Sequence, residues 1–170
     1  MARLGWTALL AVIVFVTRGA VAAPTEHEHS DHGHAATGAA LVSQMQLNDG
    51  VRWPTDASLR AGMLEIRTVF EAHHPRIHAG TQSEQQYGEL AAAVEKTVNR
   101  IVEQCKLPAA ADAQLHYVVG DLLRGVALMR GSDPAHSRHD GAALVHGALN
   151  AYGKFFDDPS WTAHGAKPVA

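Results

Sequence analysis

The chain of 170 residues has a single cysteine, so it cannot form an intrachain disulfide. Aromatic residues make up only 6% of the sequence, and this low content argues against a β-sandwich or a β-barrel. No apolar run reaches the length of about 18 residues that a transmembrane helix needs. Basic residues are not in excess either: 14 Lys and Arg stand against 17 Asp and Glu, a formal net charge of −3. This balance disfavours a nucleic-acid partner.

Motifs of the common enzyme classes are also missing. The sequence has no H-E-x-x-H, no G-x-S-x-G, no phosphate-binding glycine loop and no dinucleotide-binding fingerprint. Cys105 and His116 could form a thiolate–imidazolium pair, but no third residue that would orient them is evident. The sequence therefore predicts a protein that is not an enzyme.

The amino terminus has the three parts of a secretory signal. Arg3 comes first, an apolar stretch runs from Trp6 to Val16, and small residues follow as far as Ala23. We therefore predict a cleaved signal peptide over residues 1–23 and a mature protein in the periplasm, with no membrane attachment after cleavage. Removal of Arg3 and Arg18 lowers the 14 basic residues to 12, so the net charge becomes −5.

Residues 24–44 follow the predicted signal and are rich in histidine. Four histidines and three acidic residues lie within residues 26–34, and the segment has no apolar periodicity. The histidines are His27, His29, His32 and His34. Because imidazole is a good ligand for zinc, copper and nickel, we expect a disordered arm that captures metal ions weakly. The alternative is a solubilising linker without a specific ligand.

Apolar residues recur at spacings of three and four in four later segments, which is the pattern of helices packed in a bundle. The first row is Leu59, Met63, Ile66, Phe70, His73 and Ile77, and the second is Tyr87, Leu90, Val94, Val98, Ile101 and Cys105. The third row is Leu115, Val119, Leu122, Val126 and Met129, and the fourth is Val145, Leu149, Tyr152 and Phe156. The sequence therefore predicts an all-α fold, an up-down-up-down four-helix bundle over residues 45–162, followed by a flexible tail over residues 163–170.

Local signals place the ends of these helices. Thr55 or Asp56 is the expected N-cap of the first helix, and Pro75 is expected to kink it or to end it near His74, with Gly80 as a later stop. Residues 83–86 read as a capping box for the second helix, whose last turn is expected to hold Cys105. The third helix is expected to begin near Ala111, and the fourth after Ser137 or Asp140.

Several short blocks resemble a family of small exported helical proteins of Gram-negative bacteria, some of which are labelled DnrO. The blocks include Leu47-Asn48-Asp49-Gly50 with Trp53, Leu59-Arg60-Ala61-Gly62-Met63, Cys105-Lys106-Leu107 and Pro159-Ser160-Trp161. The resemblance covers residues 45 to 162 and implies a periplasmic helical protein linked to metal tolerance. It supplies no reaction. One departure is Asp158, where relatives often have histidine.

Three side chains with soft ligand atoms are expected to lie near the same end of the predicted bundle. Met63 lies early in the first helix, Cys105 late in the second and His116 early in the third. A thioether, a thiolate and an imidazole together suit Cu(I). We therefore predict an ordered copper site at Met63, Cys105 and His116, in a protein that binds a transition metal without catalysis.

Two alternatives stay open for this core. A non-covalent haem could use Met63 and His116 as axial ligands, although the large Val and Leu side chains leave no obvious cavity. The other alternative is a structural or adaptor bundle that binds no metal.

Six histidines are expected at the opposite end of the bundle, and the favoured interpretation is that they form a solvated rim. They are His73, His74, His78, His136, His139 and His146.

Deleting residues 24–44 is expected to leave the helical content and the melting temperature nearly unchanged, because the segment has no core-facing pattern. The deletion is expected to lower the number of weakly bound Cu(II) or Zn(II) ions, measured by equilibrium dialysis. Equal stoichiometry before and after the deletion would rule out the capture role.

Overall fold

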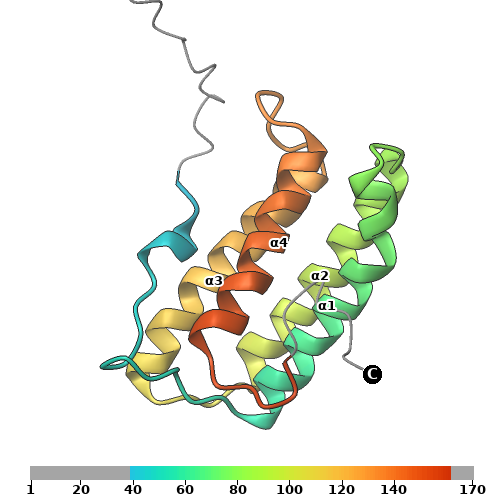
Figure 1. Ribbon diagram of the computed structural model, residues 1–170. Helices are drawn as coiled ribbons and strands as arrows, with labels where there is room; N and C mark the ends of the chain where they lie inside the picture. Colours follow the sequence, from blue (N-terminus) through green and yellow to red (C-terminus); the bar gives the residue numbers. More distant parts are fainter. Residues whose placement is uncertain (1–38, 162–170) are drawn as a thin grey trace, which may run out of the picture. The chain divides into compact units, whose positions relative to one another are not determined.

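A computed structural model describes residues 39–161 (Figure 1). These residues form four α-helices, which are α1 (Ala57–His78), α2 (Glu84–Gln104), α3 (Ala109–Met129) and α4 (Arg138–Phe155). A short 3-10 helix, η1 (Leu41–Gln44), precedes them, and no strand is present in this part of the chain. The predicted all-α class with four helices is confirmed. The predicted signal peptide and tail, and residues 24–38 of the predicted arm, lie outside the described residues.

The four helices lie side by side, and successive connections lie at alternating ends (Figure 1). Among neighbouring helices, contact is most extensive between α3 and α4, smaller between α1 and α2 and between α2 and α3, and smallest between α1 and α4. The predicted apolar rows form the core: Leu59, Met63 and Ile66 of α1 have no exposed surface. Three predicted positions are only partly buried, namely His73, Cys105 and Val119, and in α3 the neighbouring Val118 is fully buried instead. None of the helices between residues 39 and 161 is both long and apolar enough to span a bilayer.

Helix α1 continues through Pro75 to His78, so the predicted end near His74 is wrong and the later stop is right. Gly80 adopts a φ of +64°, the left-handed conformation that favours glycine after a helix. Proline lacks a backbone donor, so it removes one hydrogen bond from the helix. Ile77 is only 6% exposed, and its burial favours the extra turn.

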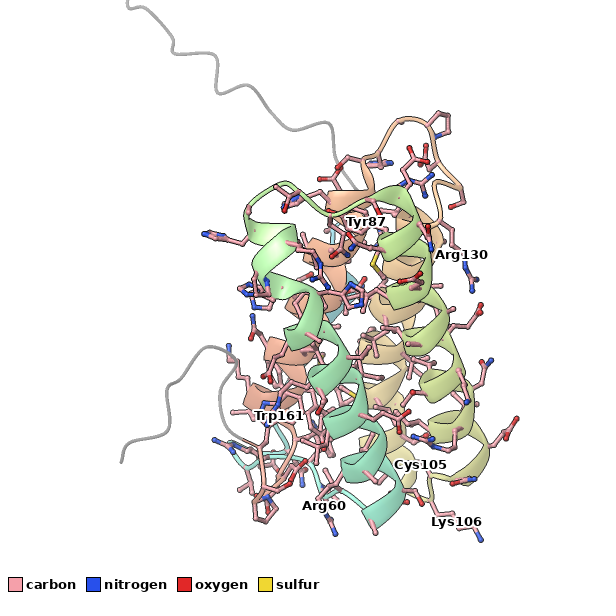
Figure 2. All side chains as sticks on the ribbon, turned by 90° about the vertical axis from the view of Figure 1, so that its right-hand side faces the viewer. Arg60, Tyr87, Cys105, Lys106, Arg130 and Trp161 are labelled. Carbon is pink, nitrogen blue, oxygen red and sulfur yellow. The ribbon has the colours of Figure 1, made fainter. Side chains whose placement is uncertain are left out.

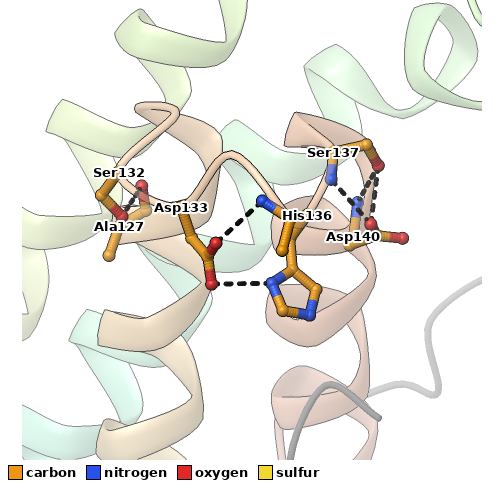
Figure 3. A network of polar contacts seen from close by, with 7 residues as sticks. Ala127, Ser132, Asp133, His136, Ser137 and Asp140 are labelled. Atoms are coloured by element: carbon orange, nitrogen blue, oxygen red, sulfur yellow. Dashed lines mark hydrogen bonds and ion pairs between the residues drawn. The ribbon is translucent and has the colours of Figure 1, made fainter. Parts of the chain in front are cut away.

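Both serine caps confirm the sequence analysis. The Ser83 hydroxyl accepts from the Gln86 amide at 3.2 Å, and the Gln86 side chain accepts from the Ser83 amide at 2.9 Å. Ser137 and Asp140 form the same reciprocal pair at the start of α4 (Figure 3). Two boundaries differ from the prediction. Helix α3 begins at Ala109, directly after Pro108, and Cys105 is the C-cap of α2 and not part of its last turn.

Residues 41–44 are folded, so the predicted boundary of a disordered arm at residue 44 is wrong. The Val42 amide donates to the carboxylate of Asp121 at 2.9 Å, and Asp121 is fully buried in α3. The Leu41 side chain covers Gly120, where an added Cβ would lie 2.5 Å from it. These contacts anchor η1 to α3, so a deletion meant to leave stability unchanged has to end before Leu41.

The segment that precedes α1 is hydrogen-bonded to the segment that follows α4. The Trp53 amide donates to the Phe155 carbonyl at 2.8 Å, and the Asp157 amide donates to the Trp53 carbonyl at 2.8 Å. The Thr55 hydroxyl adds a bond of 2.7 Å to the Asp157 carbonyl. Together these bonds form a latch between residues 53–55 and 155–157, which we call the terminal latch.

Asp158 lies directly after the terminal latch and is only 3% exposed. Its carboxylate accepts from the Tyr152 hydroxyl at 3.0 Å and from the Ser160 hydroxyl at 2.6 Å. The Asp158 carboxylate is therefore part of a hydrogen-bonded corner that follows α4.

Helices α3 and α4 approach each other at two glycines. A Cβ built on Gly141 would lie 2.6 Å from the Gly125 carbonyl oxygen and 2.6 Å from the Met129 amide. A Cβ on Gly125 would lie 2.7 Å from the Gly141 carbonyl oxygen. These neighbours are backbone atoms and cannot turn aside, so only glycine permits this spacing.

Gly141→Ala is expected to destabilise the fold by about 1–3 kcal/mol, because the added methyl group forces the two backbones apart. Gly147→Ala, in the same helix, is the matched control. It has nothing within 4 Å of the new Cβ, and it is expected to be neutral or to stabilise by roughly 0.4–1 kcal/mol. Urea unfolding followed by circular dichroism measures both changes, and equal midpoints for the two variants would contradict the close approach.

Candidate functional site

Cys105 lies at the junction between α2 and α3, where its thiol is hydrogen-bonded to Asp56. The Asp56 carboxylate also caps α1 through the Leu59 amide at 2.7 Å and accepts from the Lys106 amide at 2.6 Å. Figure 2 shows Cys105 and Lys106 at one end of the molecule and Tyr87, from the start of α2, at the other. One carboxylate therefore joins the start of α1 to the connection between α2 and α3.

This setting stabilises the neutral thiol. Burial, followed by the negative charge of Asp56 and its hydrogen bond to the thiol, raises the pKa of Cys105 to about 11. Burial also acts to raise the pKa of Asp56, but the hydrogen bonds from Leu59, Lys106 and Cys105 outweigh it and lower that pKa. Because a metal ion binds the thiolate, it would have to displace a tightly held proton here.

Cys105 and His116 line a common pocket of about 220 Å³, which we call the thiol pocket. Its lining residues are Ile101, Val102, Cys105, Asp112, Leu115, His116 and Val119. The His116 ring is 73% exposed, with Nδ1 2.8 Å from the Asp112 carbonyl oxygen. Met63 is not among the lining residues and is fully buried in the core. The structure therefore brings two of the three predicted core ligands together, and Met63 lies elsewhere.

The haem alternative requires Met63 and His116 to face one iron from opposite sides. One of these side chains is fully buried and the other is largely exposed, and they do not share a pocket. The predicted capture ligands His27, His29, His32 and His34 lie outside the described residues.

The six histidines at the other end fall into two groups. His73 Nδ1 donates to the Gln82 side-chain oxygen at 3.1 Å, and His136 Nδ1 donates to Asp133 at 2.8 Å (Figure 3). These two rings are held by hydrogen bonds next to helix ends. The other four line one pocket of about 230 Å³ between α1 and α4, which we call the histidine pocket. It is lined by Phe70, His74, Ile77, His78, His139, Ala142, Ala143 and His146.

The rings in the histidine pocket lie close together. The ring centre of His74 is 6.1 Å from that of His78, on the same helix, and 6.0 Å from that of His146, on α4. His146 is also stacked on Phe70, with ring centres 5.8 Å apart and an angle of 12° between the planes. His74 and His146 are half-buried, whereas His78 and His139 are exposed. The predicted solvated rim therefore fits only His78 and His139.

Burial, and then the charge of His74, lowers the pKa of His146. At neutral pH this imidazole is therefore mainly uncharged, and the neutral ring is the form that binds metal ions. Two imidazoles that share a tetrahedral zinc ion at Zn–N distances of about 2.0–2.1 Å have ring centres roughly 5 Å apart. The spacings in the histidine pocket exceed this value by about 1 Å. Accordingly, within residues 39–161 no three His, Cys, Asp or Glu side chains are already placed to hold an ion.

Part of this pocket could have been found from the sequence. His74 and His78 are four residues apart in one helix, and His139 and His146 are seven apart in another, so each pair shares a helix face. The sequence does not show that these two faces meet, because that depends on how the helices rotate about their axes.

Searches against protein families, curated proteins and solved structures find no match for the chain. The family resemblance of the short sequence blocks therefore stays a prediction.

The Cys105 thiol is expected to react slowly with iodoacetamide at neutral pH, with a rate that keeps rising towards pH 11, because only the thiolate reacts. Asp56→Asn is expected to increase the rate at neutral pH, since it removes the negative charge beside the thiolate and keeps a residue that can cap α1. Asp112→Asn is the control and is expected to give a smaller increase, because Asp112 is the smallest of the causes that raise this pKa. A wild-type rate that levels off below pH 9 would contradict the raised pKa.

Proposed function

We propose that the protein is an exported, non-catalytic binding protein for a transition-metal ion and that the histidine pocket is its ordered site. The observation that carries this proposal is the gathering of four imidazoles from two helices around one pocket. Of the six histidines at this end, these four are the ones whose rings face a shared space.

The ligand set determines the class of ion. Imidazole suits Cu(II), Zn(II) and Ni(II), whereas Mg²⁺ and Ca²⁺ take oxygen ligands. The predicted preference for Cu(I) depended on sulfur from Met63 and Cys105. Met63 does not line the thiol pocket, and the pKa of Cys105 is raised. The proposal therefore moves from Cu(I) to the divalent ions, with copper as Cu(II) among the first to test.

The proposal also includes the histidines of the predicted arm and the up-down-up-down order of the helices. His27, His29, His32 and His34 act as a loose capture segment ahead of the ordered site. The helices run up-down-up-down as a bundle, which the alternating ends of their connections support (Figure 1). Such bundles commonly bind metal ions between facing helices.

Calorimetric titration with Cu(II) and Zn(II) tests the proposal, using the full chain with the four arm histidines replaced by asparagine. His74→Gln is expected to weaken binding by about tenfold or more, because it removes the ring closest to two others. His116→Gln is the matched control, since it removes an exposed imidazole from the thiol pocket, and it is expected to leave the affinity unchanged.

The opposite pattern, with affinity lost in His116→Gln and kept in His74→Gln, would return the site to the thiol pocket. Absence of binding in the arm-substituted chain would refute an ordered site altogether. The structural or adaptor role would then replace metal binding.

A further inference from the structure

We infer that the ion bound in the histidine pocket bridges α1 and α4 and tightens the contact between them. The inference rests on the proposed function and adds what binding does to the fold. Its basis is that the pocket lies in the least extensive of the four contacts between neighbouring helices.

Aromatic and imidazole rings of α1 and α4 meet near the histidine pocket, and further ring contacts lie nearer the terminal latch. Towards the terminal latch, the Trp161 ring meets Tyr152 edge-on at 4.7 Å, and the Arg67 guanidinium lies 4.8 Å above the same indole. Towards the other end, His146 of α4 meets Phe70 and His74 of α1. The histidine pocket, of about 230 Å³, lies among these rings and gives this end of the interface room to close.

The distances indicate how much movement is needed. His74 is 6.1 Å from His78 and 6.0 Å from His146, against roughly 5 Å for two rings on one tetrahedral ion. A contraction of about 1 Å in each pair is within the range of side-chain rotation and a small helix shift. His78 and His139 are exposed, so their rings can turn towards the pocket without displacing core side chains.

A simpler arrangement would use α1 alone. His74 and His78 are four residues apart on one helix, a spacing at which two imidazoles chelate one ion. The position of His146 argues against this arrangement. Its ring is as close to His74 as the His78 ring is, and stacking on Phe70 holds it there. An ion at His74 therefore has ligands within reach on both helices.

Zinc titration of the arm-substituted full chain, combined with hydrogen exchange, separates the two arrangements. Zn²⁺ is expected to slow amide exchange in the last turns of α1 and in the first half of α4 together. His139→Gln and His146→Gln are each expected to weaken Zn²⁺ binding and to remove the slowing in α4. His139 is exposed, so its substitution leaves the core intact even where that of His146 does not. His116→Gln, on α3, is the control and is expected to change neither measurement.

The outcomes distinguish this inference from the function on which it rests. Unchanged zinc affinity in His139→Gln and His146→Gln, with affinity lost in His74→Gln, would mean that α1 chelates the ion alone. The bridge would then be wrong and the proposed function would stand. Absence of zinc binding in the parent chain would overturn both.

Discussion

The backbone contact between α3 and α4 at Gly125 and Gly141 is the constraint on which the rest of the structure depends. With no Cβ at either position, the two helices pack backbone to backbone, and their interface is the most extensive in the fold. Helix α4 makes a much smaller contact with α1, and that contact includes the stacking of His146 on Phe70. The histidine pocket lies in this smaller contact.

Local chemistry made most of the fold predictable. The capping boxes at Ser83 and Ser137 are formed by residues three apart, and the apolar rows follow from helical spacing, so neither depends on distant parts of the chain. The failures arise where distant contacts override local preference. Burial of Ile77 extends α1 past Pro75, and Asp121, about 80 positions along the chain, orders the 3-10 turn that contains Val42. Nothing in the sequence of residues 41–44 predicts that contact.

The candidate site was harder to predict, because spacing shows which residues share a face of one helix and not which faces of different helices meet. Position along the helix axis grouped Met63 with Cys105 and His116, because all three are expected near the same end of the bundle. Rotation about the helix axis separates them, since it turns Met63 into the core and His116 towards solvent. The same consideration applies to the other end. The spacing of His74 and His78 was visible in the sequence, whereas the meeting of their helix face with that of α4 was not.

The terminal latch has a consequence for the order of folding. Its Thr55–Asp157 bond joins residues 102 positions apart, and closing a loop of that length costs about 4 kcal/mol of chain entropy, excluding a constant term. The five residues between α1 and α2 cost about 1.4 kcal/mol on the same scale. Helices joined by short connections are therefore expected to pair first, and the latch to form only after α1 and α4 are in place. During unfolding the terminal latch is expected to open early, so unfolding would begin where the two ends of the helical domain meet.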